Sequence, residues 1–212
     1  MQKTKWTDEQ FRIQMLIIQN YIFNNNLAKV NFFFEDDKLI NLTIDNFAHL
    51  IGLQYYGKVL KQKFNLFTFL KQVSQKKILW SSIVKKIQIE WKTNLSKKFA
   101  GSFKDPKDCI NKLVFKVEAF ITIIKKISTL KTKDQIGSYQ FNNKNFVDYF
   151  LKYHHLNDDH NHYYLLGLKR ISGPNYQFDT FKPITLKIMK KDIETYFIEN
   201  WIVKKIKISS AK

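Results

Sequence analysis

The stretch TIDNFAHLIGL, residues 43–53, holds the signal around which the rest of the chain is organised. A strand-like run, residues 38–44, leads into it, and the stretch itself has the pattern of a short helix. Asp45 is predicted to cap the start of this helix, because a carboxylate accepts hydrogen bonds from the free N–H groups of a first turn. Gly52 is predicted to end the helix, because glycine adopts the left-handed conformation without penalty.

The histidine of this helix lies on a different face from the apolar residues. Phe47, Leu50 and Ile51 share one face at spacings of three and four residues. His49 lies about 200° from Phe47 on a helical wheel of about 100° per residue. Because a core histidine would share the apolar face, His49 is predicted to be presented to a ligand or to a neighbouring strand.

Composition indicates a globular protein without a membrane partner. The 212 residues are 44% hydrophobic and 16% aromatic, which favours a substantial core. No apolar run approaches the roughly 18 residues of a membrane span, and no cleavable signal is recognisable, so a cytoplasmic protein is expected. A single cysteine, Cys109, excludes an intramolecular disulfide and a cysteine-rich zinc site, and we expect it to be a buried thiol.

The charge of the chain is strongly positive. Its 36 basic and 18 acidic residues give a formal net charge of +18, and only Arg12 and Arg170 are arginines. Coding from an AT-rich genome also produces many lysines, but it does not explain the shortage of Asp and Glu. A surplus of this size favours a polyanionic partner through counterion release, with nucleic acid ahead of an acidic membrane surface.

The order of patterns predicts a single α+β domain over residues 1–212. A capping box at Thr7 and Gln10 opens an N-terminal helix, and a hairpin follows it. Apolar repeats at three and four residues make residues 60–130 a helical insert, and residues 131–144 are the best linker candidate. Later segments with strand-like alternation predict a C-terminal, mainly antiparallel sheet of about four strands. These segments are residues 149–156, 162–171, 183–189 and 201–208.

Two groups of residues are candidates for metal chemistry, and each has an ordinary structural explanation. A histidine group around Asp158 and Asp159 suits zinc or manganese, but a polar hairpin loop is preferred because metal ligands usually come from separate elements. A carboxylate–lysine group resembles the tail of metal-dependent nucleases that hold magnesium, but Asp-Asp is also ordinary turn chemistry. We therefore predict no metal and no cofactor. The groups are His154, His155, His160 and His162, and Glu35, Asp37 and Lys38.

A third group has the residue types for cutting RNA without a metal. Attack by the 2′-OH of RNA needs a base for its proton, an acid for the leaving 5′-oxygen and a cation for the phosphate. His49, Thr185 and Lys187 offer an imidazole, a hydroxyl and a cation. Lys169 and Arg170 are strand neighbours on opposite faces, so only one can line the site. Arg170 is preferred because its forked guanidinium suits a phosphate, with a structural ion pair as the alternative.

Two parts of the chain resemble a family of nucleases. The strand followed by residues 46–53 resembles the strand-then-F-x-H-L-x-G segment of phage-related nucleases of the barnase–EndoU–colicin–RelE-like class, in particular their fourth phage-associated branch. Residues 163–170, YYLLGLKR, and residues 181–189, FKPITLKIM, before a last basic strand are also similar to that class. The positions that match the first segment are Phe47, His49, Leu50 and Gly52.

The resemblance implies a helix-plus-antiparallel-sheet fold and a metal-independent endoribonuclease, toxin-like or tied to phage–host conflict. By position it implies that His49 is an acid/base residue, that Arg170 or Lys169 clamps the phosphate, and that Thr185 is a hydroxyl of the site. RNA is then favoured over DNA as the partner, and a protein antitoxin or inhibitor is expected.

Two other functions fit the residues. One is a non-catalytic, basic nucleic-acid-binding accessory protein of a phage or mobile element. The other is a metal-dependent DNA endonuclease that uses Glu35, Asp37 and Lys38. In either case lysines outside the histidine helix are candidates for contacts to phosphates. These lysines are Lys85, Lys86, Lys125, Lys126 and Lys187.

Overall fold

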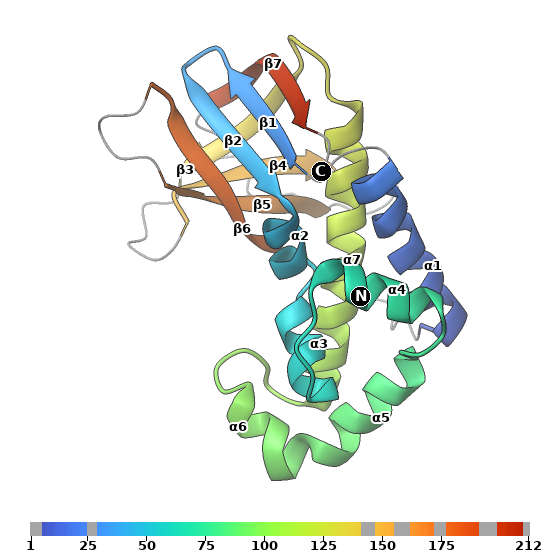
Figure 1. The fold of residues 1–212 in the computed structure, drawn as a ribbon. Helices are drawn as coiled ribbons and strands as arrows, with labels where there is room; N and C mark the ends of the chain where they lie inside the picture. Colours follow the sequence, from blue (N-terminus) through green and yellow to red (C-terminus); the bar gives the residue numbers. More distant parts are fainter. Residues whose placement is uncertain are drawn as a thin grey trace.

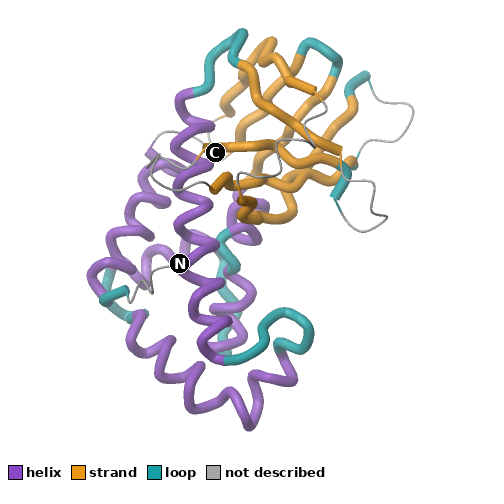
Figure 2. Tube along the Cα trace, turned by 180° about the vertical axis from the view of Figure 1, so that it is seen from behind, coloured by secondary structure: helices purple, strands orange, loops and turns teal. Residues whose placement is uncertain are grey.

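A β-barrel stands on a layer of helices in the computed structural model (Figure 1). The long helix α7 (Pro106–Thr129) runs through the helical layer up to the barrel, and Figure 2 shows the same two parts from behind. The structure describes residues 6–24, 29–140, 147–154, 162–171, 177–190 and 199–209.

Seven strands of the described residues close the barrel in the order β1-β2-β6-β5-β4-β3-β7, with β7 paired to β1. Neighbours are antiparallel except β2 and β6, which run parallel through residues 38–40 and 179–181. The strands are β1 (Lys29–Phe34), β2 (Lys38–Thr43), β3 (Gln135–Gln140), β4 (Tyr149–His154), β5 (His162–Arg170), β6 (Asp179–Lys190) and β7 (Glu199–Ser209).

This barrel corrects the fold expected from the sequence. The prediction of a C-terminal, mainly antiparallel sheet of about four strands is wrong, because those strands close a mixed barrel with the N-terminal hairpin and β3. The strand β3 lies inside residues 131–144, the segment predicted to be the best linker candidate. Ile136 and Ser138 of β3 are nevertheless buried, and β3 joins β4 to β7.

Two helices begin at residues with capping side chains. The capping box is confirmed, since the Thr7 N–H donates to Gln10 Oε1 at 2.8 Å and the Gln10 N–H donates to Thr7 Oγ1 at 3.1 Å. Asp105 caps α7 by accepting from the Asp108 N–H at 2.8 Å. The other helices are α1 (Asp8–Gln19), α2 (Ile44–Leu50), α3 (Leu53–Leu60), α4 (Leu66–Ser74), α5 (Trp80–Glu90) and α6 (Ser96–Lys98), with π-helical turns at Asn20–Asn24 and Trp91–Leu95.

Buried side chains of the barrel and of the helices pack into a common cluster. At the junction Phe47 contacts Phe120, with ring centroids 5.3 Å apart. Inside the barrel the fully buried Trp201 packs against Phe34 at 5.2 Å. Burying one such side chain stabilises the fold by about 1.5–3 kcal/mol. Cys109 is buried as expected, and burial raises the pKa of its thiol to about 12. Within the described ranges, no helix has both the length and the apolar character needed to cross a membrane.

The stretch 43–53 lies where the barrel meets the helices (Figure 1). The predicted cap at Asp45 is wrong by two positions, because α2 begins at Ile44 and Thr43 is its N-cap. The Thr43 N–H and hydroxyl donate to Asn46 Oδ1 at 3.0 and 2.9 Å, while Asp45 is exposed in the first turn. The β2 chain therefore passes directly into α2 with no loop between them.

The apolar face and the end of α2 agree with the prediction. Phe47, Leu50 and Ile51 are buried, whereas His49 is exposed. Gly52 follows the helix with φ of 81°, and its N–H donates to the His49 carbonyl oxygen at 3.0 Å. The place of His49 within α2 therefore sets the direction of its side chain, opposite to the buried face.

Candidate active site

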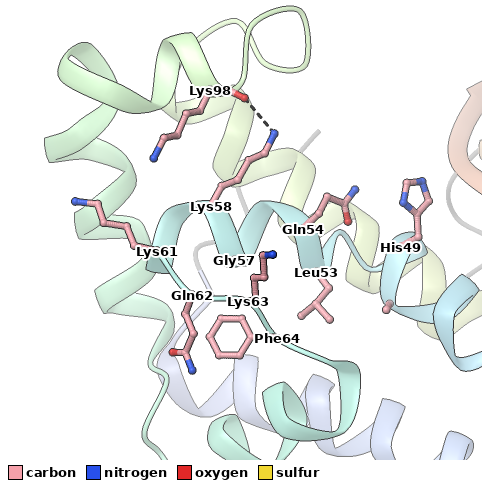
Figure 3. A pocket seen from close by; sticks show the side chains of 11 residues that line it. His49, Leu53, Gln54, Gly57, Lys58, Lys61, Gln62, Lys63, Phe64 and Lys98 are labelled. Carbon is pink, nitrogen blue, oxygen red and sulfur yellow. Dashed lines mark hydrogen bonds between the residues drawn. The ribbon is translucent and has the colours of Figure 1, made fainter.

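His49 lines two adjoining pockets, each of about 600 Å³. The first, called here the barrel-side pocket, lies between α2 and the barrel strands β5 and β6. The second, the helix-side pocket, lies along α2 and α3 (Figure 3). Beside His49, the barrel-side pocket is lined by Val147, Lys169, Lys182, Ile184, Thr185 and Lys187.

Strand register places the polar residues of the barrel-side pocket on one face. Thr185 of β6 lies opposite Gly167 of β5, and Lys187 is two residues further along the same strand. The register shifts by one residue after Gly167, so Lys169 lies opposite Lys182. Because directly opposed residues project to the same side of a sheet, these cations and the hydroxyl share the face toward α2.

The pKa of His49 lies below its usual value. The main cause is loss of water around the imidazole, followed by the positive charge of Lys116 and, more weakly, that of Lys182. A hydrogen bond with the backbone of Ile184 acts in the opposite direction, as expected when an imidazole N–H donates to a carbonyl oxygen. The lowered pKa favours the neutral form of the imidazole, which is the form that can accept a proton.

Lys116 of α7 is a neighbour of His49 that the sequence did not single out. Its ammonium group lies 6.0 Å from the ring centroid of Tyr55. Its Cδ lies 3.0 Å from the place where a side chain at Gly52 would begin, so it packs against the α2–α3 junction. Burial lowers the pKa of Lys116 below its usual value. No local pattern in the sequence of α7 indicates that Lys116 packs against the junction of α2 and α3.

Of the two strand neighbours, Lys169 lines the barrel-side pocket and Arg170 does not. The Lys169 ammonium lies 3.3 Å from Asp148 Oδ1. The exposed Arg170 guanidinium donates to Asp179 Oδ2 at 2.5 Å and lies 5.8 Å from the ring centroid of Phe181. Arg170 thus has the ion pair that was the alternative interpretation for it, on the face of the strand that is turned away from His49.

The lysines predicted to contact nucleic acid are divided between two places. Lys187 lines the barrel-side pocket, and its ammonium lies 5.2 Å from the ring centroid of Phe150. The four on α5 and α7 line neither pocket: Lys85, Lys86, Lys125 and Lys126. Sequence reasoning missed the lysines that line the pockets from other elements, because only the fold gathers them. These are Lys58, Lys61, Lys63, Lys98 and Lys182.

The candidate metal groups lie apart from His49. Lys38 is at the end of β2 that is far from α2, and its ammonium pairs with Asp36. Asp37 has φ of 57° in the turn between β1 and β2, as the turn interpretation predicts, and Glu35 is exposed there. In the part of the chain that the structure describes, no three His, Cys, Asp or Glu side chains are placed to share a metal ion. His155 and His160 lie outside the described residues, as do the side chains of His154 and His162.

The absence of a side chain at Gly167 leaves room for the Thr185 methyl group, and this gives a testable prediction. A Cβ at Gly167 would lie 2.5 Å from Thr185 Cγ2 and 3.0 Å from Phe150 Cε1. Gly167→Ala is therefore expected to destabilise the protein by about 1–3 kcal/mol, the usual cost of overpacking. Adding Thr185→Ser removes the methyl group and should recover part of that loss. Chemical denaturation of the single and double variants measures both effects, and an unchanged Gly167→Ala would contradict the close contact.

The site combines an imidazole of lowered pKa, a hydroxyl and several lysines around two pockets that share His49. Among the described residues, no carboxylate lines either pocket. Such a combination suits binding of a phosphate and proton transfer beside it. Comparison with known protein families, curated proteins and solved structures finds no match to this chain.

Proposed function

We propose that the protein is a metal-independent endoribonuclease that cleaves RNA by attack of the 2′-OH on the adjacent phosphate. The observation that carries the proposal is the position of His49 on two pockets that are lined by lysines and by no described carboxylate, with its pKa lowered by loss of water and by nearby lysines. A toxin-like role, and a protein that inhibits it, follow from the resemblance of residues 43–53 to the phage-associated nucleases.

In the proposed reaction His49 takes the proton of the 2′-OH. The 2′-oxygen then forms a bond to phosphorus, and the bond from phosphorus to the 5′-oxygen breaks. Lys169 and Lys182 face the same pocket and neutralise the charge on the phosphate, while Thr185 donates a hydrogen bond to it. An ammonium group of the pocket protonates the leaving 5′-oxygen, so the products are a 2′,3′-cyclic phosphate and a 5′-hydroxyl end.

The proposal is tested by incubating labelled RNA with the protein in EDTA. The expected products carry 2′,3′-cyclic phosphate ends, and RNA with 2′-O-methyl groups should stay intact because it lacks the attacking hydroxyl. Cleavage that requires magnesium, or that cuts the methylated RNA, would contradict the mechanism.

Binding of nucleic acid without cleavage is the second candidate function. The same pockets favour it, because lysines bind phosphates whether or not His49 transfers a proton. The EDTA experiment separates the two, since a binding protein retains RNA intact.

The low pKa of His49 predicts the pH dependence of cleavage. A general base acts in its neutral form, so the rate should rise with pH through a pKa below the usual histidine value and then level off. Lys116 lowers the pKa of His49 by its charge, so Lys116→Met should move the rising limb to higher pH. Lys116→Arg keeps the positive charge, so the rising limb of its pH profile should stay closer to that of the wild type. The measurement is kcat/KM across pH, and an unmoved limb in Lys116→Met would contradict the coupling.

A further inference from the structure

The proposed reaction uses the barrel-side pocket and leaves the helix-side pocket without a role. That second pocket is also about 600 Å³, and four lysines are among its lining residues: Lys58, Lys61, Lys63 and Lys98. In Figure 3 Lys58, Lys61 and Lys98 gather on one side of α3, and Gln54 lies between Lys58 and His49. Lys61 also pairs with Glu90 at 2.9 Å, and Glu90 does not line the pocket.

The helix-side pocket is shaped by specific contacts. The Gln62 N–H donates to the Gly57 carbonyl oxygen at 3.0 Å, and this folds the turn after α3 back onto the helix. A Cβ at Gly57 would lie 2.7 Å from the Gln62 carbonyl oxygen, so the turn requires a glycine there. The Lys58 ammonium donates to the Lys98 carbonyl oxygen at 3.2 Å, which ties α3 to α6 across the pocket (Figure 3). These contacts fix the turn after α3 and hold Lys58 beside α6.

We propose that the helix-side pocket binds an unpaired nucleotide next to the cleaved phosphate, so that the substrate is single-stranded RNA held on both sides of His49. This inference rests on the proposed function, because His49 is the residue common to the two pockets. The lysines bind the backbone phosphates.

The remaining lining residues suit a base. Phe64 presents a ring that packs against Phe69, with centroids 5.4 Å apart, and an aromatic ring of this kind stacks on an unpaired base. Gln54 and Gln62 carry amides that both donate and accept hydrogen bonds, as base edges require. A base inside a duplex presents neither its faces nor its pairing edge, so a pocket of this kind selects an unpaired strand.

The test compares two charge-matched variants of the full chain. Lys58→Gln/Lys61→Gln/Lys63→Gln removes lysines of the pocket. The control, Lys71→Gln/Lys76→Gln/Lys77→Gln, removes three exposed lysines that line neither pocket. The probes are fluorescent 2′-O-methyl RNAs, a dinucleotide and a strand of about ten nucleotides, the latter within the usual site size of a single-strand-binding groove. Anisotropy gives their affinities over a range of salt concentrations.

The pocket variant should bind the long strand at least about tenfold more weakly than the control at about 0.1 M salt. The slope of log affinity against log salt should be shallower by about 2, from roughly 0.7 for each lost phosphate contact on a single strand. The dinucleotide carries a single phosphate, so its affinity should fall less in the pocket variant than the affinity of the long strand does.

Three results would overturn the inference. Equal affinity of the two variants for the long strand would show that the helix-side pocket does not bind RNA, and it would leave the proposed function standing. Equally strong competition by polyglutamate of the same charge would show a site for acidic protein segments instead of nucleotides. A wild-type protein that retains no RNA would overturn the proposed function and this inference together.

Discussion

Replacement of His49 by alanine is expected to lower kcat for RNA cleavage by about 10²–10⁴-fold, the usual contribution of a general acid or base. The imidazole lines both pockets, and its lowered pKa keeps it in the form that accepts a proton. Because the His49 side chain is exposed and gives up only its hydrogen bond with the Ile184 backbone, the free energy of unfolding should fall by no more than about 1.5 kcal/mol. Single-turnover cleavage and chemical denaturation measure the two quantities separately.

Asp45 supplies the matched control for this experiment. It is exposed on the same short helix and lines neither pocket, so Asp45→Ala should cut RNA at the wild-type rate. Binding of 2′-O-methyl RNA should survive in His49→Ala, because the lysines that hold the phosphates remain. If His49→Ala cuts RNA as fast as Asp45→Ala, His49 is not the base. The lysine-lined groove would then favour binding without cleavage.

Local patterns in the sequence predicted where His49 points. Helical periodicity separates it from Phe47 and Leu50, and the structure buries those two residues while it exposes the histidine. Alternation in β6 likewise puts Thr185 and Lys187 on one side of the strand, and both line the pocket that His49 lines. Both features depend on the direction of a side chain within one element, which the period of that element determines.

The closure of the barrel could not be predicted in the same way. The parallel contact of β2 with β6 joins residues 38–40 to residues 179–181, and no pattern within either strand indicates its partner. The segment Gln135–Gln140 has few apolar residues, yet it pairs on both sides and completes the barrel. Pairings between distant strands depend on how the whole chain packs. Patterns within single strands therefore do not predict that the sheet closes into a barrel.

The sequence did not predict that Lys182 lies opposite Lys169, because the pairing of β5 with β6 contains a register shift. Lys182 precedes Pro183, and simple alternation from Thr185 would place it on the other face of β6. The register shift after Gly167 brings Lys182 back to the outer face, beside Lys169. A bulge of this kind redirects side chains near functional sites. The same shift leaves Arg170 opposite Phe181, outside the pocket.

Substitution of Lys182 by glutamine is expected to lower kcat by about 10²–10³-fold, the usual loss when one group that stabilises the charge of a transition state is removed. Lys182 is singled out because its charge acts on His49, whereas Lys169 is partly neutralised by Asp148 at 3.3 Å. Lys169→Gln should therefore have the smaller effect. Lys204→Gln, at an exposed position of β7 that lines neither pocket, should have none.

The pH profile shows whether Lys182 acts beside the reacting groups or only attracts RNA. Its positive charge lowers the pKa of His49, so Lys182→Gln should move the rising limb of kcat to higher pH. A lysine that only attracts RNA would instead raise KM and leave both kcat and that limb unchanged. A raised KM alone would therefore contradict a role for Lys182 at the phosphate. A lower kcat together with a rising limb moved to higher pH would place the cleaved phosphate between β6 and His49.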